Sequence, residues 1–280
     1  MEQHHHVALS RPGTRLFADH REACSLWERL VGQVPGLVAL CLMPDHVHLQ
    51  SRQDARVALG QVMADYAQSR NRLRGQTGAV WWGQRAPQVL VDRDKIRRSV
   101  RYIHLNPCRK KPLVGDPLSW PWSTHRDACG LALTPAVARR GDPYAFHAYV
   151  SGDPSVSVDG TLLPAHGPDG HEAWPDLLEE ALGALGRTPP SRFRRRGPAR
   201  RALVRLLRAE TALTPAEIAL RCGVSARTVR RASDRSETWM RQVGRVAGDP
   251  RFGSLACLDA AISRYQPWRG QGSEAPWRAR

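Results

Sequence analysis

The sequence predicts an α+β fold, an antiparallel sheet with packed helices, together with an all-α domain toward the C-terminus. Two observations predict it. Apolar strand-like segments and segments of helical periodicity alternate over residues 4–106 with short connections, as in helices that cover one sheet. From about residue 150 the composition turns to Gly, Pro and Ser, and Arg-rich helical segments follow. We therefore expect a first domain over 1–150, a linker or extension over 151–186 and a basic helical domain over 187–280.

Each element of the first domain has its own signal. Alternating or apolar runs predict strands, and apolar residues at helical spacing predict helices, in the order strand, helix, strand, helix, short strand, helix. Pro107 ends the last helix, because proline cannot continue the helical hydrogen bonding. The expected ranges are 4–10, 19–30, 36–50, 55–73, 75–85 and 93–106.

The charge of the chain points to a polyanionic partner. The formal net charge is +16, nearly all of it from arginine, so nucleic acid is the expected partner. No apolar run reaches the about 18 residues of a membrane span, and no signal peptide is recognisable, so we expect a cytoplasmic protein with no membrane partner. Six scattered cysteines without a C-x-x-C pair argue against a zinc ribbon or a disulfide framework, and we expect them to be reduced and mostly buried.

The stretch MPDHVHLQ, residues 43–50, places two histidines two positions apart after an apolar run. In a strand, His46 and His48 point to one face while Val47 and Leu49 point to the other. Two neighbouring imidazoles supply two ligands of a metal site. The alternative is a pair of ordinary polar residues on a half-buried strand, and the spacing alone does not decide between the two.

The predicted helix over 93–106 carries a phenol and an amide one turn apart, Tyr102 and Asn106. They share a face turned about 100° from the apolar stripe of the helix, and this face is basic and predicted to be accessible. The alternative is a half-buried tyrosine followed by an asparagine near the helix end, where Asn and a following Pro are common stop signals.

Five motifs in sequence order carry a family resemblance. MPDHVHL resembles the His-hydrophobe-His motif of the HUH single-tyrosine nucleases, and VRYIHLNPCRK resembles the tyrosine helix of the REP-associated tyrosine transposases. HHVALSRPG, GAVWWGQR and SWPWSTHR resemble that family's first strand, its Gly-x-x-Trp-x-x-Arg segment and its Trp-Ser-Ser stretch. The similarity covers about residues 4–130. The chain departs from the family at Asp45, where Asn is common, and at Ala86 and Pro87, where Phe and a basic residue are usual.

The resemblance implies an HUH nuclease-like fold with ferredoxin/RRM-like topology, and a reaction. Tyr102 would cleave single-stranded DNA, forming a 5′-phosphotyrosine link and leaving a free 3′-hydroxyl. His46, His48 and Asn106 would hold a divalent ion, Mg²⁺ or Mn²⁺, that neutralises charge on the phosphate. The implied partners are single-stranded and hairpin DNA of repetitive palindromic elements, which would associate the protein with the nucleoid.

Other side chains could take part. Tyr66 is a rival nucleophile, although apolar residues precede it by one turn and no Asn or Gln follows four positions on. Arg98 and Arg101 could lower the pKa of Tyr102 or hold phosphates, and a solvated basic face explains them equally well. Arg85 is a candidate DNA contact. Four tryptophans could stack on bases or pack in the core, and both readings stay open for Trp81, Trp82, Trp120 and Trp122.

The stretch LTPAEIALRCGVSARTVRRAS, residues 213–233, has the spacing of a helix-turn-helix. Thr214 and Glu217 form a capping box, Gly223 permits a turn and Ser225 caps a second helix. That helix would offer four side chains to a major groove: Arg227, Thr228, Arg230 and Arg231. The alternative is a packing element without a DNA role, but ten arginines against two acidic residues over 187–221 favour DNA.

These motifs together predict a metal-dependent, transposase-like DNA endonuclease and strand transferase that acts on hairpin-forming repeats. The main alternative is a non-catalytic repeat-DNA-binding protein or transcriptional regulator that retains the fold. An RNA-binding protein is a weaker alternative, because no RNA-binding motif is recognisable. The sequence does not decide between a monomer and a dimer with shared active sites.

Overall fold

The structure is a computed structural model. The residues that it describes are 2–109, 112–132, 135–159, 201, 204–205, 207–208, 213–232, 251 and 255–269. The chain divides into two compact units, the first made of 1–129, 136–163 and 256–280 and the second of 130–135 and 164–255. The domain boundaries drawn from composition stay predictions, and most of the predicted linker lies outside the described residues.

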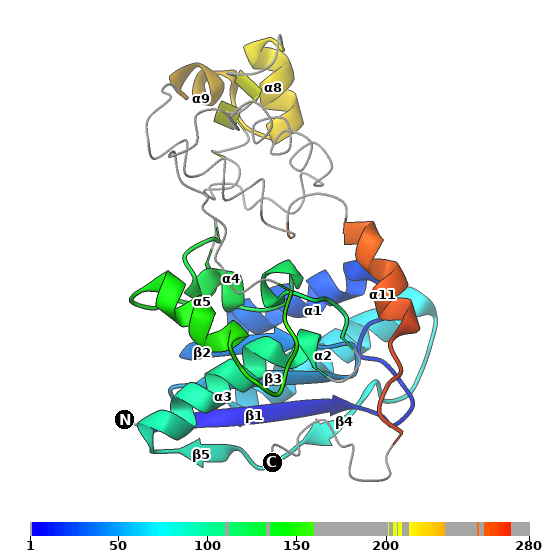
Figure 1. The fold of residues 1–280 in the computed structure, drawn as a ribbon. Helices are drawn as coiled ribbons and strands as arrows, with labels where there is room; N and C mark the ends of the chain where they lie inside the picture. The colour runs from blue at the N-terminus through cyan, green and yellow to red at the C-terminus, as the bar shows by residue number, and fades with distance from the viewer. Residues whose placement is uncertain are drawn as a thin grey trace. The chain divides into compact units, whose positions relative to one another are not determined.

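An antiparallel sheet forms the centre of the first unit (Figure 1). Its strands run in the spatial order β2-β3-β1-β4, and β5 also pairs with β1, so β3 has a neighbour on each side. The strand bounds are Gln3–Ser10 for β1, Leu37–Leu42 for β2, His46–Ser51 for β3, Trp81–Gln84 for β4 and Gln88–Leu90 for β5. The predicted antiparallel sheet is therefore confirmed, and β5 was not predicted.

One predicted strand is wrong. Residues 36–50 form a hairpin, not a single strand, because β2 ends at Leu42 and β3 begins at His46. Pro44 and Asp45 lie in the turn, where proline and aspartate are favoured residues, and the Met43 amide donates to the His46 carbonyl at 2.8 Å. The turn brings Asp45 beside the first histidine of the motif.

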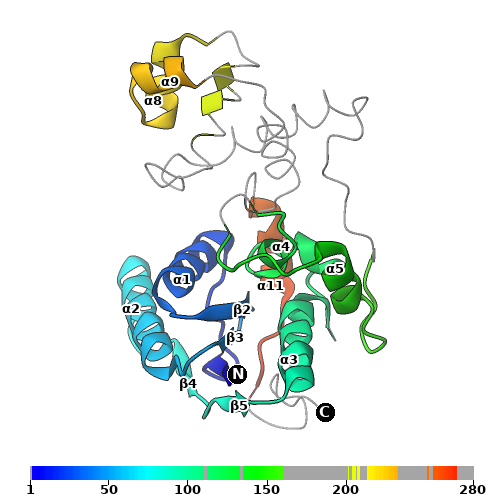
Figure 2. The same cartoon turned by 90° about the vertical axis from the view of Figure 1, so that its left-hand side faces the viewer.

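Helices cover both faces of the sheet, with α1 and α2 on one side and α3 on the other (Figure 2). Side chains cap the helix starts: Asp19 accepts from the Glu22 amide before α1, and Asp92 accepts from the amides of residues 94 and 95 before α3. The helices of this unit are α1 His20–Gln33, α2 Arg56–Arg74, α3 Arg93–Leu105, α4 His125–Ala128, α5 Pro143–Ser151 and α11 Asp259–Arg264. The predicted helices over 19–30, 55–73 and 93–106 are confirmed, with small differences at their ends.

The strand β3 is buried on both faces, and the alternation of its side chains decides what each face does. The rings of His48 and Tyr102 of α3 lie 5.2 Å apart, so the histidine face is turned toward α3. Val47 and Leu49 therefore point toward α1 and α2, where they are fully buried. Burying a side chain of this size stabilises the fold by about 1.5–3 kcal/mol, which fixes the register of the strand and the direction of its histidines.

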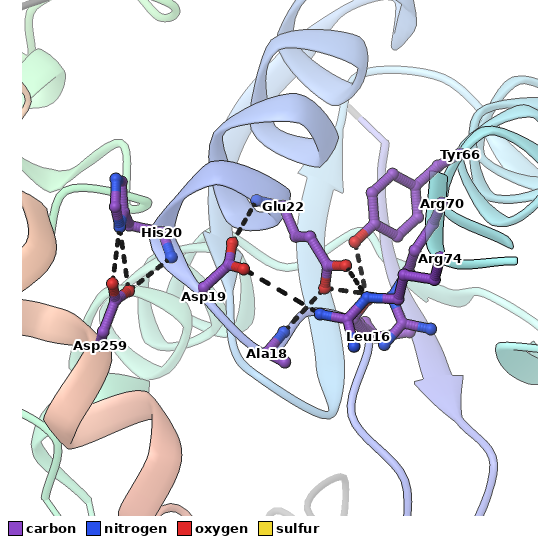
Figure 3. A network of polar contacts seen from close by, with 9 residues as sticks. All are labelled: Leu16, Ala18, Asp19, His20, Glu22, Tyr66, Arg70, Arg74 and Asp259. Carbon is purple, nitrogen blue, oxygen red and sulfur yellow. Dashed lines mark hydrogen bonds and ion pairs between the residues drawn. The ribbon is translucent and has the colours of Figure 1, made fainter. Parts of the chain in front are cut away.

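The chain returns to the first unit near its C-terminus. Asp259 at the start of α11 accepts from the backbone amide of His20 at 2.7 Å and lies 2.9 Å from the imidazole of the same residue (Figure 3). Arg15 donates to the carbonyls of Ser263 and Tyr265 at 2.6 and 2.7 Å. Residues 259–269 thus form a segment attached to the loop after β1, and we refer to it as the return segment.

The described part of the second unit includes two short helices with defined ends, α8 Pro215–Cys222 and α9 Ala226–Arg231, and helical residues at 201, 204–205 and 207–208. The predicted local signals are present, because Thr214 and Glu217 form a capping box and Gly223 ends α8 at a φ of 59°. Ser225 accepts from the amide of residue 228 to cap α9. The helix-turn-helix domain itself stays a prediction, and the other predicted helices of this region fall mostly outside the described residues. None of the described helices combines the length and apolarity needed to cross a bilayer.

Candidate active site

Four predicted side chains from two elements come together between the sheet and α3. His46 and His48 project from β3, and their rings lie 4.8 Å apart. Asn106 follows α3, and its Oδ1 lies 3.5 Å from Nε2 of His46. The ring of Tyr102 stands perpendicular to that of His48, with centroids 5.2 Å apart. Residues separated by more than fifty positions in the sequence thus form one cluster.

The Nδ1 atom of each histidine lies within hydrogen-bond distance of a neighbouring side chain, which orients the ring. Nδ1 of His46 lies 2.5 Å from Oδ1 of Asp45, which leaves Nε2 of His46 facing Asn106. Nδ1 of His48 lies 3.0 Å from Nε2 of His5 on β1. Metal-binding histidines commonly use one nitrogen for the ion and the other for such a partner. The sequence reasoning missed both partners. The signal for His5 is the antiparallel pairing, which sets His5 opposite Gln50 and on the same face as His48.

The donor set fits a divalent ion. The Nδ2 group of Asn106 donates to the Tyr102 carbonyl at 3.0 Å, which fixes the amide with Oδ1 toward His46. Two imidazole nitrogens and one amide oxygen then lie on one side of the sheet. A mixed nitrogen and oxygen set of three protein ligands leaves room for substrate oxygens, as Mg²⁺ and Mn²⁺ sites in phosphoryl-transfer enzymes do.

The face that carries the tyrosine is less accessible than the sequence suggested. Tyr102 is half-buried, and Asn106 is only 8% exposed. Burial raises the pKa of Tyr102, Arg109 lowers it, and Cys41 raises it. The guanidinium carbon of Arg109 lies 4.8 Å from the centre of the Tyr102 ring. The strongest influence on the phenol is therefore its burial, and the nearby cation is Arg109.

Neither Arg98 nor Arg101 is among the groups that shift the pKa of Tyr102, and the predicted phosphate contacts of both stay predictions. Arg98 is exposed, and its Nε donates to the carbonyl of residue 94 at 3.4 Å. Arg101 pairs with Asp153 at 3.2 Å and lies over the ring of Tyr149. Arg109 lies beyond the end of α3, and the short 3-10 turn Asn106–Cys108 brings its guanidinium over the Tyr102 ring.

The rival tyrosine lies in the core. Tyr66 is 2% exposed, and its hydroxyl donates to the carbonyl of Leu16 at 2.7 Å (Figure 3). Burial raises the pKa of Tyr66 far above its usual value. A phenol that is buried, bonded to a backbone carbonyl and hard to ionise is a packing residue, which is the alternative that the sequence had left open.

We expect Tyr66→Phe to lower the free energy of unfolding by about 1–2 kcal/mol, because a buried carbonyl loses its donor while the ring still fills its space. Chemical denaturation monitored by circular dichroism measures this change. A variant as stable as the original chain would contradict the role assigned to the Leu16 contact.

The tryptophans divide between core and surface. Trp120 and Trp122 are buried, and Nε1 of Trp120 donates to the Leu42 carbonyl at 3.0 Å, so both pack in the core. Trp82 is 59% exposed and stacks on Trp268 of the return segment, with ring centroids 5.4 Å apart.

The other candidate DNA contacts lie at the surface. Arg85 is exposed and directly follows β4, the strand that carries Trp82. The arginines and the threonine of α9 are exposed as well, namely Arg227, Thr228, Arg230 and Arg231.

The return segment contacts Asp45, the partner of His46. Asp45 accepts from the hydroxyl of Tyr265 at 2.9 Å and from the amide of Trp268 at 2.8 Å. Burial alone would raise the pKa of Asp45, but His46 and these hydrogen bonds outweigh it and lower the pKa. Asp45 is therefore a buried carboxylate with three partners.

A second group of side chains could hold a metal ion. His125, Cys129 and His147 are buried, and their ligand atoms lie within 4.8 Å of one another. The sequence reasoning missed this group, although the i, i+4 spacing of His125 and Cys129 in a helical segment is a signal that could have found them. Five cysteines are buried and form no disulfide, as predicted, namely Cys24, Cys41, Cys108, Cys129 and Cys222.

Comparisons with known proteins give one structural likeness. Among solved structures the chain is similar to a REP-associated tyrosine transposase bound to a REP hairpin. The likeness covers 51% of this chain and 86% of that chain, at 20% sequence identity and a TM-score of 0.36. It concerns the fold alone. No family model matches the chain, and no curated protein does.

Proposed function

We propose that the chain is a metal-dependent, single-tyrosine DNA endonuclease and strand transferase that acts on hairpin-forming repeat DNA. The observation that supports this most is that four side chains meet at one place, namely His46, His48, Asn106 and Tyr102. Nε2 of His46 lies 3.5 Å from Oδ1 of Asn106. A protein that only binds DNA would have no need of a phenol beside three metal-ligand groups.

His46, His48 and Asn106 would hold Mg²⁺ or Mn²⁺. When bound, such an ion withdraws charge from a phosphate oxygen and makes the phosphorus more open to attack. The residues around the site keep the ligands ready: Asp45 and His5 each occupy the Nδ1 side of a ligand histidine. Their contribution is to fix ring orientation before substrate arrives, so that little reorganisation is needed.

Tyr102 would be the nucleophile. Its oxygen attacks the phosphorus, the bond from phosphorus to the 3′-oxygen breaks, and the DNA 5′-phosphate stays on the tyrosine while a 3′-hydroxyl is released. Because a phenolate is a far better leaving group than an alkoxide, a 3′-hydroxyl can later reverse the step and rejoin strands. Arg109 opposes the rise in the pKa of Tyr102 that burial causes, so it favours the attacking form.

The exposed residues would hold the DNA. Trp82 presents an accessible ring that could stack on an unpaired base, and Arg85 and Arg98 are exposed cations for phosphates. The α9 helix would contact the duplex stem of a folded repeat. This division of labour gives single-strand chemistry to the first unit and duplex binding to the second.

A covalent adduct assay tests the proposal. The full chain is incubated with a single-stranded hairpin oligonucleotide labelled on the 3′ side of the cleavage point, with Mn²⁺ or with excess chelator. We expect a protein–DNA adduct on a denaturing gel with Mn²⁺ and none with the chelator. Hairpin binding without any adduct, across several hairpin sequences and both ions, would favour the non-catalytic alternative.

The role of α9 is tested by charge removal. We expect Arg230→Gln and Arg231→Gln each to weaken duplex binding at all sequences and to reduce the slope of log affinity against log salt by about 1, because each removes one phosphate contact. Binding of a labelled duplex at several salt concentrations measures the slope. Glu217→Gln, within the capping box of α8, is a control that leaves the arginines in place, and an unchanged slope in both arginine variants would contradict a DNA role for this helix.

A further inference from the structure

A second polar cluster lies buried beside α3, separate from the candidate active site. It consists of His125 on α4, Cys129 directly after α4, and His147 on α5. Nε2 of His125 lies 2.9 Å from Nδ1 of His147 and 3.8 Å from Sγ of Cys129. The active site uses none of these groups.

The distances are close to those of a tetrahedral zinc site. Ligand atoms about 2.0–2.3 Å from a tetrahedral ion lie about 3.3–3.6 Å from one another. The two distances from His125 lie on either side of this range, and all three ligand atoms are within 4.8 Å of one another.

The two ring nitrogens of His125 face different neighbours. Nδ1 of His125 lies 3.2 Å from Nδ1 of His104, whose Nε2 lies 3.1 Å from the hydroxyl of Thr124. The outer nitrogen of His125 thus has a partner of its own, and its Nε2 faces Cys129 and His147.

This is the arrangement in which a metal-binding histidine is held by a partner on its outer nitrogen. His125, Cys129 and His147 are all buried, and burying polar groups is costly unless they find partners. A cation between Nε2 of His125, Nδ1 of His147 and Sγ of Cys129 would be a shared partner for the three.

We propose that His125, Cys129 and His147 bind a zinc-class divalent ion. Two imidazoles and a thiolate are the ligands that zinc prefers, while Mg²⁺ and Mn²⁺ prefer oxygen, so this ion differs in chemistry from the one at His46 and His48. It would join α4 to α5. Through the bond from His125 to His104, it would also steady α3 two positions beyond Tyr102.

Metal content of the purified full chain tests the proposal. We expect elemental analysis to find about one zinc per chain, and both Cys129→Ala and His147→Ala to lose it. Cys24→Ala, which removes another buried cysteine, is the matched control and should keep the zinc. His48→Ala should keep it as well, which separates this site from the proposed catalytic one.

A spectroscopic measurement covers variants that do not fold. Replacing zinc by Co²⁺ in the original chain should give a thiolate-to-cobalt absorption band, and added zinc should raise the melting temperature of the chelator-treated protein. A chain that purifies without zinc and gives no such band with Co²⁺ would overturn the proposal. Full zinc content in folded Cys129→Ala or His147→Ala would overturn it too. None of these readouts depends on DNA cleavage.

Discussion

Tyr102→Phe is expected to abolish the covalent protein–DNA adduct and to reduce strand cleavage by about 10⁴-fold or more. The substitution removes only the phenolic oxygen, the atom that would attack the phosphorus. The ring remains, so its perpendicular contact with His48 and its contact with Arg109 are kept. The measurement is the cleavage rate of a labelled hairpin under single-turnover conditions with Mn²⁺, followed over hours to detect residual activity.

Two controls make the result specific. Circular dichroism and a melting curve should show that Tyr102→Phe is folded, and its affinity for the hairpin should be close to that of the original chain. Tyr66→Phe, which changes the same atom in the core, should keep the adduct even though it is less stable. An adduct that persists in Tyr102→Phe and vanishes in Tyr66→Phe would contradict the assignment of the nucleophile.

Local sequence patterns predict much of the fold and both halves of the candidate active site, the histidine pair of β3 and the pair of Tyr102 and Asn106. The i, i+4 relation of Tyr102 and Asn106 is a property of one helix, and the alternation that sets His46 and His48 on one face is a property of one strand. Both could be read without knowing the tertiary structure. The capping box at Thr214 is of the same kind.

The features that were missed depend on contacts between distant segments. The sequence predicts a single strand across the hairpin at Pro44, because two apolar runs flank a very short turn. His5 joins the site through strand pairing, and Arg109 through the turn of chain beyond α3. Nothing in the composition of residues 259–269 suggests that they belong to the first unit, since their attachment depends on individual contacts with distant residues. Examples are the hydrogen bonds to Asp45 and the stacking of Trp268 on Trp82.

Asp45→Ala is expected to weaken the apparent affinity for Mn²⁺ by about 10–100-fold, the usual effect of removing a partner that orients a metal-binding histidine. Without the carboxylate, Nδ1 of His46 loses a bond of 2.5 Å, and the ring is free to turn its Nε2 away from Asn106. The readout is the dependence of the cleavage rate on Mn²⁺ concentration, with the rate at saturating ion measured separately. A shift of the half-saturating concentration with a smaller change in the maximal rate indicates a positioning role.

Tyr265→Phe separates the two contacts of the Asp45 carboxylate, one with His46 and one with the return segment. The substitution removes the hydrogen bond of 2.9 Å from the return segment but leaves Asp45 next to His46, so the half-saturating Mn²⁺ concentration should change much less than in Asp45→Ala.

Because the pKa of Asp45 is lowered in the folded chain, its carboxylate stabilises the fold above the ordinary carboxyl pKa, and that stability is lost as pH falls through the lowered value. Asp45→Ala should therefore flatten the acid side of the stability profile. If Asp45→Ala changed neither the Mn²⁺ dependence of cleavage nor the loss of stability at acid pH, the Asp45 carboxylate would neither orient His46 nor stabilise the fold through its charge.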